Sequence, residues 1–257
     1  MTAKSERPII VTRPSGQADE LLAQASELSN EVRHHPLIDI HSFDDDGSIA
    51  ANAARRKILD IDRYDAVIAI SRNAAECGLT WLDDYWPQYP VGIRWYGVGP
   101  TTAEVMRAGG LEPEMPESRF DSEGVLELPS LQNIEQEKIL IWRGVGGRET
   151  LASVLRQRNA HVDYAELYER RQIDWSQTDW DSTLTGSPLL ILSSGQALDI
   201  AEQQVRNLKD RITALLVPSE RVATYAREQG YRDVIVAASA RNEDTLHSLR
   251  AWLAAAR

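Results

Sequence analysis

The chain has 257 residues, of which 42% are hydrophobic and 26% are charged, a composition typical of globular proteins and not of disordered or fibrous ones. It carries 28 lysines and arginines against 39 aspartates and glutamates, and the net charge of -11 argues against nucleic acid and anionic membranes as partners. The single cysteine, Cys77, leaves no pair for a disulfide or a cysteine-based metal site, and no apolar run suits a signal peptide or a membrane span. We therefore expect a cytoplasmic protein without a metal centre.

Short apolar strands alternate with amphipathic segments of helical length along the whole chain. We expect strands at 8–11, 66–70, 94–98, 138–142, 188–192, 214–217 and 233–237. We expect helices at 16–28, 48–60, 73–85, 101–109, 148–158, 196–206, 219–229 and 243–256, the last of them capped by Asn242. Continuous apolar strands separated by helices are typical of parallel sheets covered on both faces, so the sequence predicts an α/β fold.

Segments of the first half resemble segments of the second half in the same order. A shift of 130 residues aligns 8–22 with 138–152, a shift of 122 aligns 65–79 with 187–201, and a shift of 120 pairs Ala103 with Ala223. These matches predict a duplicated α/β unit and two domains, with a ligand site expected in the cleft between them.

Two extended segments, 32–43 and 165–175, follow the first strand, helix and strand of each copy. If the chain crosses between the domains at both segments, the domains are discontinuous in sequence. The two crossings can then pair as a two-stranded ladder.

Small polar residues and a helix start follow most of the expected strands. The candidate binding residues in these loops are Arg13, Ser71, Asn73, Thr102, Gly144, Ser194 and Ser219. Ligands of open parallel sheets bind beyond the carboxyl ends of the strands, and helix N-termini attract anions. For any single loop, helix capping is the more frequent explanation, but the recurrence of the pattern favours anion binding.

The segment RGVGGRE at 143–149 is the sharpest single motif. Its glycines let backbone N–H groups approach a ligand, and Arg143 and Arg148 lie on either side of them. The motif is neither a Walker A loop nor a dinucleotide fingerprint, which disfavours nucleotide binding. Glu149 is expected to cap a helix or pair with an arginine. The surrounding segment 138–171 has seven basic and four acidic residues, a local charge of +3 in an acidic chain.

Tyr168 lies on the second extended segment, beside Glu169 and Arg170. A tyrosine in such a strand most often packs in a core, but its hydroxyl can also donate a hydrogen bond into a ligand site. Both roles stay open on the sequence alone. The adjacent His34 and His35 point to opposite sides of a strand, which argues against a shared metal.

The motifs in their order along almost the whole chain resemble bacterial uroporphyrinogen-III synthases. They are VTRP (11–14), the Ser-x-Asn helix start at 71–73, VGPTTA (98–103), RGVGGRE (143–149), the Tyr-x-Arg at 168–170, SSG (193–195) and PSERVATYAREQG (218–230). One departure is AIS at 69–71, where many relatives have a threonine-rich FTS. A site built from backbone groups tolerates that change.

The resemblance implies two flavodoxin-like parallel-sheet domains, discontinuous in sequence and joined by a two-stranded β ladder. The first domain would combine 1–36 with 174–257, the second would span 44–164, and 37–43 and 165–173 would be the linker strands. We expect a monomer, because no uninterrupted apolar surface pattern demands a partner.

The resemblance further implies a lyase of tetrapyrrole biosynthesis, the route to haem, sirohaem and cobalamin. Such an enzyme dehydrates and cyclises the linear tetrapyrrole hydroxymethylbilane with inversion of ring D, giving uroporphyrinogen III without a cofactor. Tyr168 would assist departure of the hydroxyl group. The acetate and propionate groups would be bound by Arg13, Ser71, Asn73, Thr102, Arg143, Gly144, Arg148, Ser194 and Ser219.

Two other classes of protein remain open on the sequence. One is a two-lobed α/β binding protein that closes on a small organic acid without turnover, although the motif set and the expected lack of a signal peptide count against it. The other is a regulatory protein that has kept the fold and lost catalysis.

Overall fold

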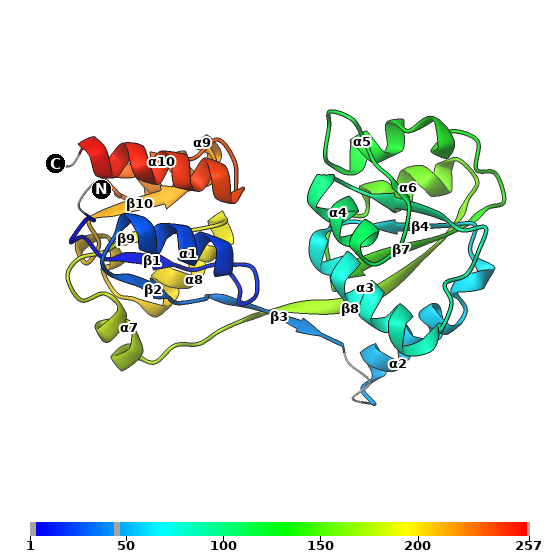
Figure 1. Ribbon diagram of the computed structural model, residues 1–257, viewed down its shortest axis with the longest axis horizontal. Helices are drawn as coiled ribbons and strands as arrows, with labels where there is room; N and C mark the ends of the chain where they lie inside the picture. The colour runs from blue at the N-terminus through cyan, green and yellow to red at the C-terminus, as the bar shows by residue number, and fades with distance from the viewer. Residues whose placement is uncertain (1–3, 44–46, 256–257) are drawn as a thin grey trace. The chain divides into compact units, whose positions relative to one another are not determined.

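The computed structural model describes residues 4–43 and 47–255, and the chain divides into two compact units. Unit 1 contains Met1–Asp39 and Arg171–Arg257, and unit 2 contains Ile40–Arg170. Each unit contains a sheet of parallel strands with helices packed against it, which confirms the predicted fold class (Figure 1). The edge strand β3 (Ile38–Ser42) is the exception to the parallel direction. In the part of the chain that the structure describes, no helix is both long enough and apolar enough to cross a membrane.

Unit 1 contains a five-stranded parallel sheet in the order β11-β10-β9-β1-β2. Its strands are β1 (Ile9–Val11), β2 (Val32–His34), β9 (Leu189–Ile191), β10 (Ala214–Val217) and β11 (Val234–Val236). Its helices are α1 (Asp19–Leu28), α7 (Gln177–Thr183), α8 (Gly195–Gln204), α9 (Glu220–Glu228) and α10 (Asn242–Ala255).

The core of unit 1 follows from the alternation of side chains along its short strands. Ile9 and Val11 pack in one cluster with apolar residues of α1 and α10. Ile10, between them in sequence, points to the opposite face and is fully buried as well. Both faces of the sheet are therefore covered, as continuous apolar strands require.

Unit 2 contains most of a six-stranded sheet in the order β3-β8-β7-β4-β5-β6, of which β3 begins before residue 40 and β8 ends after residue 170. Its strands are β3 (Ile38–Ser42), β4 (Ala66–Ala69), β5 (Arg94–Gly97), β6 (Pro113–Glu114), β7 (Lys138–Gly144) and β8 (His161–Gln172). Its helices are α2 (Ile49–Leu59), α3 (Arg72–Tyr85), α4 (Pro100–Ala108), α5 (Ser122–Glu127) and α6 (Thr150–Gln157). Apolar residues of α2, α3 and α4 cover one face of the sheet, and those of α5 and α6 cover the other.

The two sheets share one strand order. Unit 1 reads β2-β1-β9-β10-β11 in space, which is the flavodoxin-like order 2-1-3-4-5. Unit 2 reads β8-β7-β4-β5-β6, so β7 and β8 correspond to β1 and β2, and β4 to β6 correspond to β9 to β11. The sequence shifts that align 8–22 with 138–152 and 65–79 with 187–201 pair these same strands.

All seven predicted strands and all eight predicted helices are present, with ends displaced by a few residues. Helices α5 and α7 and the two-residue strand β6 are additional. The extended segment 32–43 also divides, because its first residues form β2 in the sheet of unit 1 and its later residues form β3.

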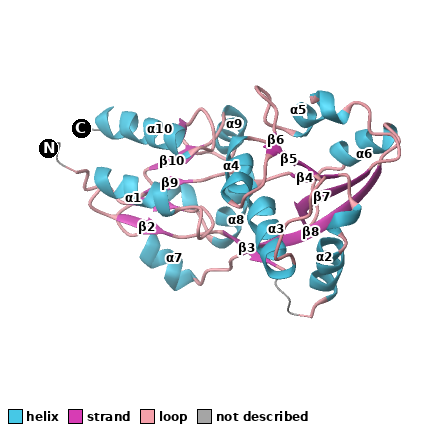
Figure 2. Cartoon of the chain, turned by 45° about the vertical axis from the view of Figure 1, so that its right-hand side comes forward, coloured by secondary structure: helices cyan, strands magenta, loops and turns pink. Residues whose placement is uncertain are grey.

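Strand β3 is the neighbour of β8, the long strand that also runs beside β7 (Figure 2). The Phe43 N–H donates to the Leu167 carbonyl at 2.9 Å, and the Ile173 N–H donates to the Leu37 carbonyl at 3.0 Å. Residue numbers along β3 and β8 thus run in opposite directions. The predicted domain boundaries and the role of 37–43 and 165–173 as linkers stay predictions.

Candidate functional site

In a flavodoxin-like sheet, the connections that follow the first and third strands leave toward opposite faces and open a crevice at the carboxyl ends of these strands. In unit 2 these strands are β7 and β4, which end at Gly144 and Ala69. In unit 1 they are β1 and β9, which end at Val11 and Ile191. Most of the predicted binding residues lie at or just after these ends, and Thr102 and Ser219 follow the adjacent strands β5 and β10.

Tyr168 is brought to the carboxyl edge of unit 2 by an irregularity in β8. Arg143 is opposite Glu166, whereas the next residue of β7, Gly144, is opposite Tyr168, so β8 carries one extra residue here. As a result Leu167 and Tyr168, although consecutive, both belong to the core cluster on the α3 face. A regular strand would have sent one of them to the other face.

The Tyr168 hydroxyl lies 3.1 Å from the Ser71 Oγ atom, while the Tyr168 ring is 3% exposed and packs in the core. Ser71 is the N-cap of α3, and its Oγ accepts a hydrogen bond from the Ala74 N–H at 3.1 Å. The structure thus gives Tyr168 a packed ring and a hydroxyl held at the start of a helix, where the helix dipole favours negative charge. The two roles that the sequence leaves open for Tyr168, packing in the core and hydrogen bonding to a ligand, are therefore compatible in one side chain.

Gly144 makes room for this tyrosine. A Cβ atom on Gly144 would lie 2.7 Å from two atoms of the Tyr168 ring, closer than side chains pack. The glycine is therefore needed for the close approach of the ring.

The loop at 143–149 is organised around Arg143, whose side chain is 3% exposed. Its guanidinium donates to Glu149 Oε1 at 3.0 Å and to the carbonyls of Gly144 and Gly146, and it lies over the Tyr164 ring. The prediction that Glu149 pairs with an arginine is confirmed. Hydrogen bonds from Tyr164 and Arg143 hold the pKa of Glu149 below its usual value.

Gly146 and Gly147 have φ angles of 74° and 105°, which side chains other than glycine rarely adopt. They turn the chain above the buried Arg143. Arg148 is exposed and borders a cavity of about 160 Å³. The cavity is lined by Ile70, Ser122, Ile141, Arg143, Arg148, Leu151, Ala152 and Tyr164.

Asn73 and Thr102 occupy the first turns of α3 and α4, and both are buried. Helix α4 begins at Pro100, a residue suited to the first helical position because it lacks an N–H group. Unit 2 therefore gathers Ser71, Asn73, Thr102, Arg143, Gly144, Arg148 and Tyr168 at or near the carboxyl ends of β4, β5 and β7.

Arg13 follows β1 in unit 1 and is bound by the start of α10. Its guanidinium donates to the Ala240 carbonyl at 2.6 Å, to the Asn242 Oδ1 atom and to the Thr245 Oγ1 atom at 3.3 Å. Burial lowers the pKa of Arg13, although the nearby Glu20 acts in the other direction. The expectation that Asn242 caps α10 is wrong, because Asn242 is the first residue of that helix and its side chain binds Arg13 and Glu20.

Ser194 and Ser219 are the N-caps of α8 and α9 in unit 1. The Ser194 Oγ atom accepts from the Ala197 N–H at 3.2 Å, and the Ser219 Oγ atom accepts from the Val222 N–H at 3.5 Å. Unit 1 thus places Arg13, Ser194 and Ser219 after β1, β9 and β10, at the carboxyl edge of its own sheet.

Comparison with known proteins assigns the chain to a family. The family model described as uroporphyrinogen-III synthase HemD matches residues 19–247. The uroporphyrinogen-III synthases of Salmonella typhimurium and Escherichia coli are each 32% identical, over 249 and 254 residues. Each alignment covers 94% of this chain and 99% of the relative. The chain belongs to the uroporphyrinogen-III synthase family.

The fold agrees with solved structures of uroporphyrinogen-III synthases. The enzyme from Helicobacter pylori superposes with a TM-score of 0.62 at 14% identity, covering 96% of this chain and 99% of that one. A mutant enzyme from Thermus thermophilus gives a TM-score of 0.61 at 12% identity, covering 96% of this chain and 98% of that one. At these identities the likeness establishes the fold.

In this member of the uroporphyrinogen-III synthase family, the structure also places residues that the motifs do not reveal. The Tyr164 hydroxyl donates a hydrogen bond to Glu149, and the Arg143 guanidinium lies over the Tyr164 ring. Phe120, against Gly99 at the start of α4, and Val145, in the glycine-rich loop, each expose about half of their surface. Exposed apolar side chains at this edge are suited to contact an apolar ring system.

Proposed function

We propose that this protein is a uroporphyrinogen-III synthase, a lyase that converts hydroxymethylbilane into uroporphyrinogen III. The observation that carries the proposal for the site is the pairing of the Tyr168 hydroxyl with Ser71 at the N-terminus of α3, beside the glycine-rich loop. This arrangement offers a hydroxyl donor and several helix N-termini in the region where flavodoxin-like sheets bind ligands.

The reaction removes water and closes the ring. The hydroxyl of the substrate leaves together with a proton, and the pyrrole that carried the hydroxymethyl group becomes an electrophilic azafulvene. The substituted carbon of ring D attacks it and forms a spirocyclic pyrrolenine, which fragments and recloses with ring D inverted. Because unassisted closure gives the symmetrical type I isomer, the enzyme chiefly controls which carbon attacks, and positioning supplies most of the catalysis.

We assign Tyr168 to the first step. Its hydroxyl donates a hydrogen bond to the departing hydroxyl group and stabilises the negative charge that develops there. Ser71 holds the phenol oxygen in place at 3.1 Å, and the positive end of α3 favours the developing charge. A carboxylate at this point would risk trapping the azafulvene, whereas a phenol is a poorer nucleophile.

The acetate and propionate groups are bound by helix N-termini and arginines. Hydroxyl, amide and backbone N–H donors come from Asn73, Thr102, Gly144, Ser194 and Ser219, and Arg13 and Arg148 add positive charge. Ser71 contributes its backbone N–H, because its hydroxyl proton is donated to Tyr168. Arg143 contributes through the loop that it holds, because its guanidinium is engaged by Glu149 and two carbonyls. Phe120 and Val145 offer apolar surface to the pyrrole rings.

A product analysis tests the proposed function. The protein is incubated with freshly generated hydroxymethylbilane, the products are oxidised, and the isomers are separated by chromatography. A synthase gives type III in clear excess over a control without protein, which gives type I. Type I alone would contradict the proposal and would leave a binding or regulatory protein with this fold.

We also propose that the protein works as a cytoplasmic monomer. The single cysteine, Cys77, leaves no pair for an internal disulfide, as is usual in a reducing compartment. Sedimentation velocity at several protein concentrations tests the monomer. The proposal requires one species with the mass of a single chain at every concentration.

A further inference from the structure

The positive segment 138–171 is divided by the fold between two opposite edges of one sheet. Lys138 begins β7 and Gly144 ends it, and six residues of strand separate the two by about 20 Å. Arg143 and Arg148 therefore lie at the carboxyl edge with the proposed site. Lys138 and Arg156 line a cavity at the amino edge, where the proposed function does not use them.

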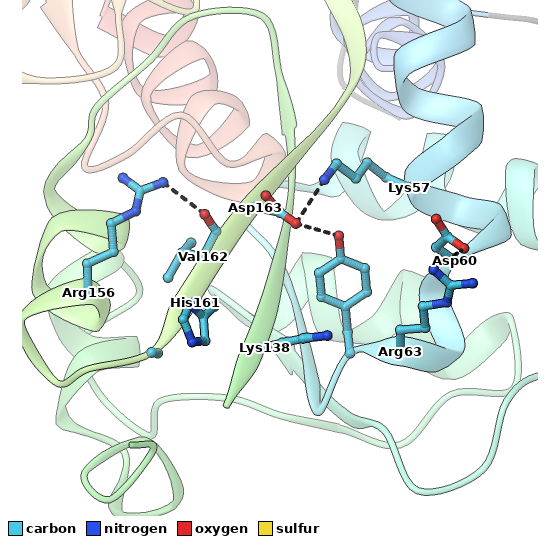
Figure 3. Close-up of a pocket in the computed structure, with 10 residues that line it drawn as sticks. Lys57, Asp60, Arg63, Lys138, Arg156, His161, Val162 and Asp163 are labelled. Atoms are coloured by element: carbon cyan, nitrogen blue, oxygen red, sulfur yellow. Dashed lines mark hydrogen bonds and ion pairs between the residues drawn. The ribbon is translucent and has the colours of Figure 1, made fainter. Parts of the chain in front are cut away.

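This cavity has a volume of about 670 Å³ and lies entirely within unit 2 (Figure 3). It is formed by the end of α2, the turn before β4, the end of α6 and the first residues of β7 and β8. Its lining consists of Lys57, Asp60, Arg63, Tyr64, Lys138, Arg156, Ala160, His161, Val162 and Asp163. The volume falls in the range of small-molecule sites in proteins.

The lining is positively charged, in contrast to the whole chain. It contains four lysines and arginines and two aspartates, a balance of +2 with His161 neutral, whereas the chain carries -11. Both aspartates are already bound within the lining. Asp163 lies 2.8 Å from the Lys57 ammonium and 2.7 Å from the Tyr64 hydroxyl, and Asp60 lies 3.3 Å from the Arg63 guanidinium.

Lys138 and Arg156 supply the excess charge. Among the residues that the structure describes, no carboxylate oxygen lies within 4 Å of the Lys138 ammonium or the Arg156 guanidinium nitrogens, although the Asp65 carboxylate accepts from the Lys138 backbone N–H at 2.7 Å. Arg156 donates one N–H to the Val162 carbonyl at 2.9 Å, which leaves further donors on its guanidinium. Figure 3 shows Lys138 and His161 at the first residues of β7 and β8, and Arg156 at the end of α6, with its guanidinium directed toward the Val162 carbonyl.

The amino edge of the sheet in unit 1 has a cavity too, and the lining of that cavity has no excess of positive charge. The cavity at the amino end of β10 in unit 1, of about 300 Å³, is lined by two cations, Lys209 and Arg232, and two carboxylates, Asp210 and Asp233. Its charge is balanced. The larger cavity of unit 2 is thus the one suited to an anion.

We propose that the amino-edge cavity of unit 2 binds a small organic anion with at least two negative charges, carried by a phosphate group or by neighbouring carboxylates. Lys138 and Arg156 bind the charged group, because an ammonium and a guanidinium give the strongest hydrogen bonds to such oxygens. The site is separate from the proposed synthase site and does not depend on the proposed function.

The test uses the full chain with pyrophosphate and citrate as probes, one for each source of charge. Titrations are followed by chemical shifts of backbone amides at low salt and by calorimetry. We expect saturable binding of at least one probe, with shifts at residues 138 and 161–163, whereas shifts at 144 and 168 would report binding at the separate carboxyl edge. The probe that binds more tightly identifies the phosphate or the carboxylate form of the ligand.

Lys138→Glu is the decisive variant, and it should weaken binding of that probe at least tenfold. Its backbone N–H bond to Asp65 remains, and its side chain is exposed, so the fold should survive. Lys138→Gln gives a milder second variant with a smaller loss. Arg107→Glu, which makes the same change in charge on exposed α4 outside the cavity, should bind as the wild type does.

Binding of neither probe, shifts confined to the carboxyl edge, or unchanged affinity in both Lys138 variants would overturn the proposal. Isomer analysis of Lys138→Glu keeps the two proposals apart, since we expect its excess of type III to equal that of the wild type. Probe binding in a protein that gives only type I would support this site and contradict the synthase.

Discussion

Tyr168 combines at one position a ring that packs in the core and a hydroxyl that faces a helix start. The ring belongs to the apolar cluster beneath α3, and the hydroxyl is 3.1 Å from Ser71. A phenylalanine could replace the ring almost without loss of volume, so the hydroxyl can be tested separately from the packing.

We predict that Tyr168→Phe keeps the fold and lowers kcat by about 10- to 100-fold with little change in KM. The lost hydrogen bond forms to a group that becomes negatively charged, and such bonds are worth about 1.5–3 kcal/mol. Steady-state kinetics and isomer separation check the result, and the share of type I should rise as spontaneous closure competes. Tyr89→Phe, which removes a hydroxyl bonded to Asp83, is the matched control and should behave as the wild type. Unchanged kcat and isomer ratio in Tyr168→Phe would leave this residue a packing role.

We predict that Gly144→Ala destabilises the protein by about 1–3 kcal/mol, since a new Cβ would lie 2.7 Å from the Tyr168 ring. In a Tyr168→Leu background, which lacks the nearest ring atoms, most of this cost should disappear. Urea unfolding of the four proteins in the cycle measures the coupling. Gly195→Ala, where no heavy atom lies within 4 Å of the new Cβ, should leave the free energy of unfolding nearly unchanged. Equal costs of Gly144→Ala in both backgrounds would show that the ring is not the obstacle.

The sequence could place residues such as Ser71 and Ser194 at helix starts, because serine is a preferred N-cap residue and each of these serines follows an apolar strand. It could not orient Tyr168, because the extra residue in β8 has no sequence signal of its own. It also could not show that Arg143 is buried and satisfied internally, since that depends on Tyr164 and Glu149 lying together.

At the scale of elements, helix α7 and the segment before it are fixed to unit 1 by an aromatic cluster. The His35 ring stacks on Trp175 at 4.3 Å and contacts Trp180 at 4.2 Å, and its Nδ1 atom lies 3.1 Å from the Thr183 hydroxyl. The Nε2 atom is buried, with no hydrogen-bond partner among the described residues. Burial lowers the pKa of His35 to about 4, although Asp179 acts to raise it.

We predict that this histidine makes the protein less stable in mild acid. Its pKa is lower in the folded state than in the unfolded state, near 6.5, so the unfolded chain binds the proton first. Full stability is therefore present above about pH 6.5 and is lost as the pH falls toward 4. Between about pH 7.5 and 5 the loss from His35 should be about 2 kcal/mol. Urea unfolding at both values measures it, and His35→Phe should remove this part of the difference. Parallel pH dependence in both proteins would contradict the burial of a neutral imidazole.

The elements themselves were predictable to different degrees. Helix α7 carries a capping box of Ser176 and Asp179 that the sequence contains, but the helix is only seven residues long and shows no clear periodicity. Strand β6 has two residues, too few for any alternation. The segment 32–43 reads as one extended stretch, because β2 and β3 differ only in the sheet that each of them joins.

At the scale of the whole molecule, the fold class followed from continuous apolar strands, and the region of the site followed from the parallel direction of those strands. The distribution of charge between the two edges of the sheet could not be predicted from the sequence. A sum over 138–171 gives +3, but β7 carries Lys138 and Arg143 to opposite edges of one sheet. Charges that are neighbours in sequence therefore act on different places.

The charge distribution leads to a prediction about the change of KM with added salt. The sign of this change shows whether repulsion by the net charge or local attraction is the larger effect. The proposed substrate carries eight carboxylates, so the net charge of -11 repels it, while Arg13, Arg148 and the helix N-termini attract it locally. Added salt shortens the screening length from about 30 Å at about 10 mM to about 8 Å at about 150 mM and weakens both effects. If local attraction dominates, as we expect, KM rises several-fold over this range of NaCl while kcat changes little.

Arg148→Gln connects this salt dependence to the proposed site. The side chain is exposed, so its loss should leave stability unchanged, raise KM at low salt and flatten the dependence of KM on NaCl. Arg250→Gln, which removes an exposed charge from α10, should keep the wild-type slope. The measurement is KM for hydroxymethylbilane across the salt series in all three proteins. A KM that falls as salt is added would show that repulsion by the acidic surface outweighs local attraction, and equal slopes in Arg148→Gln and the wild type would show that Arg148 does not bind the carboxylates.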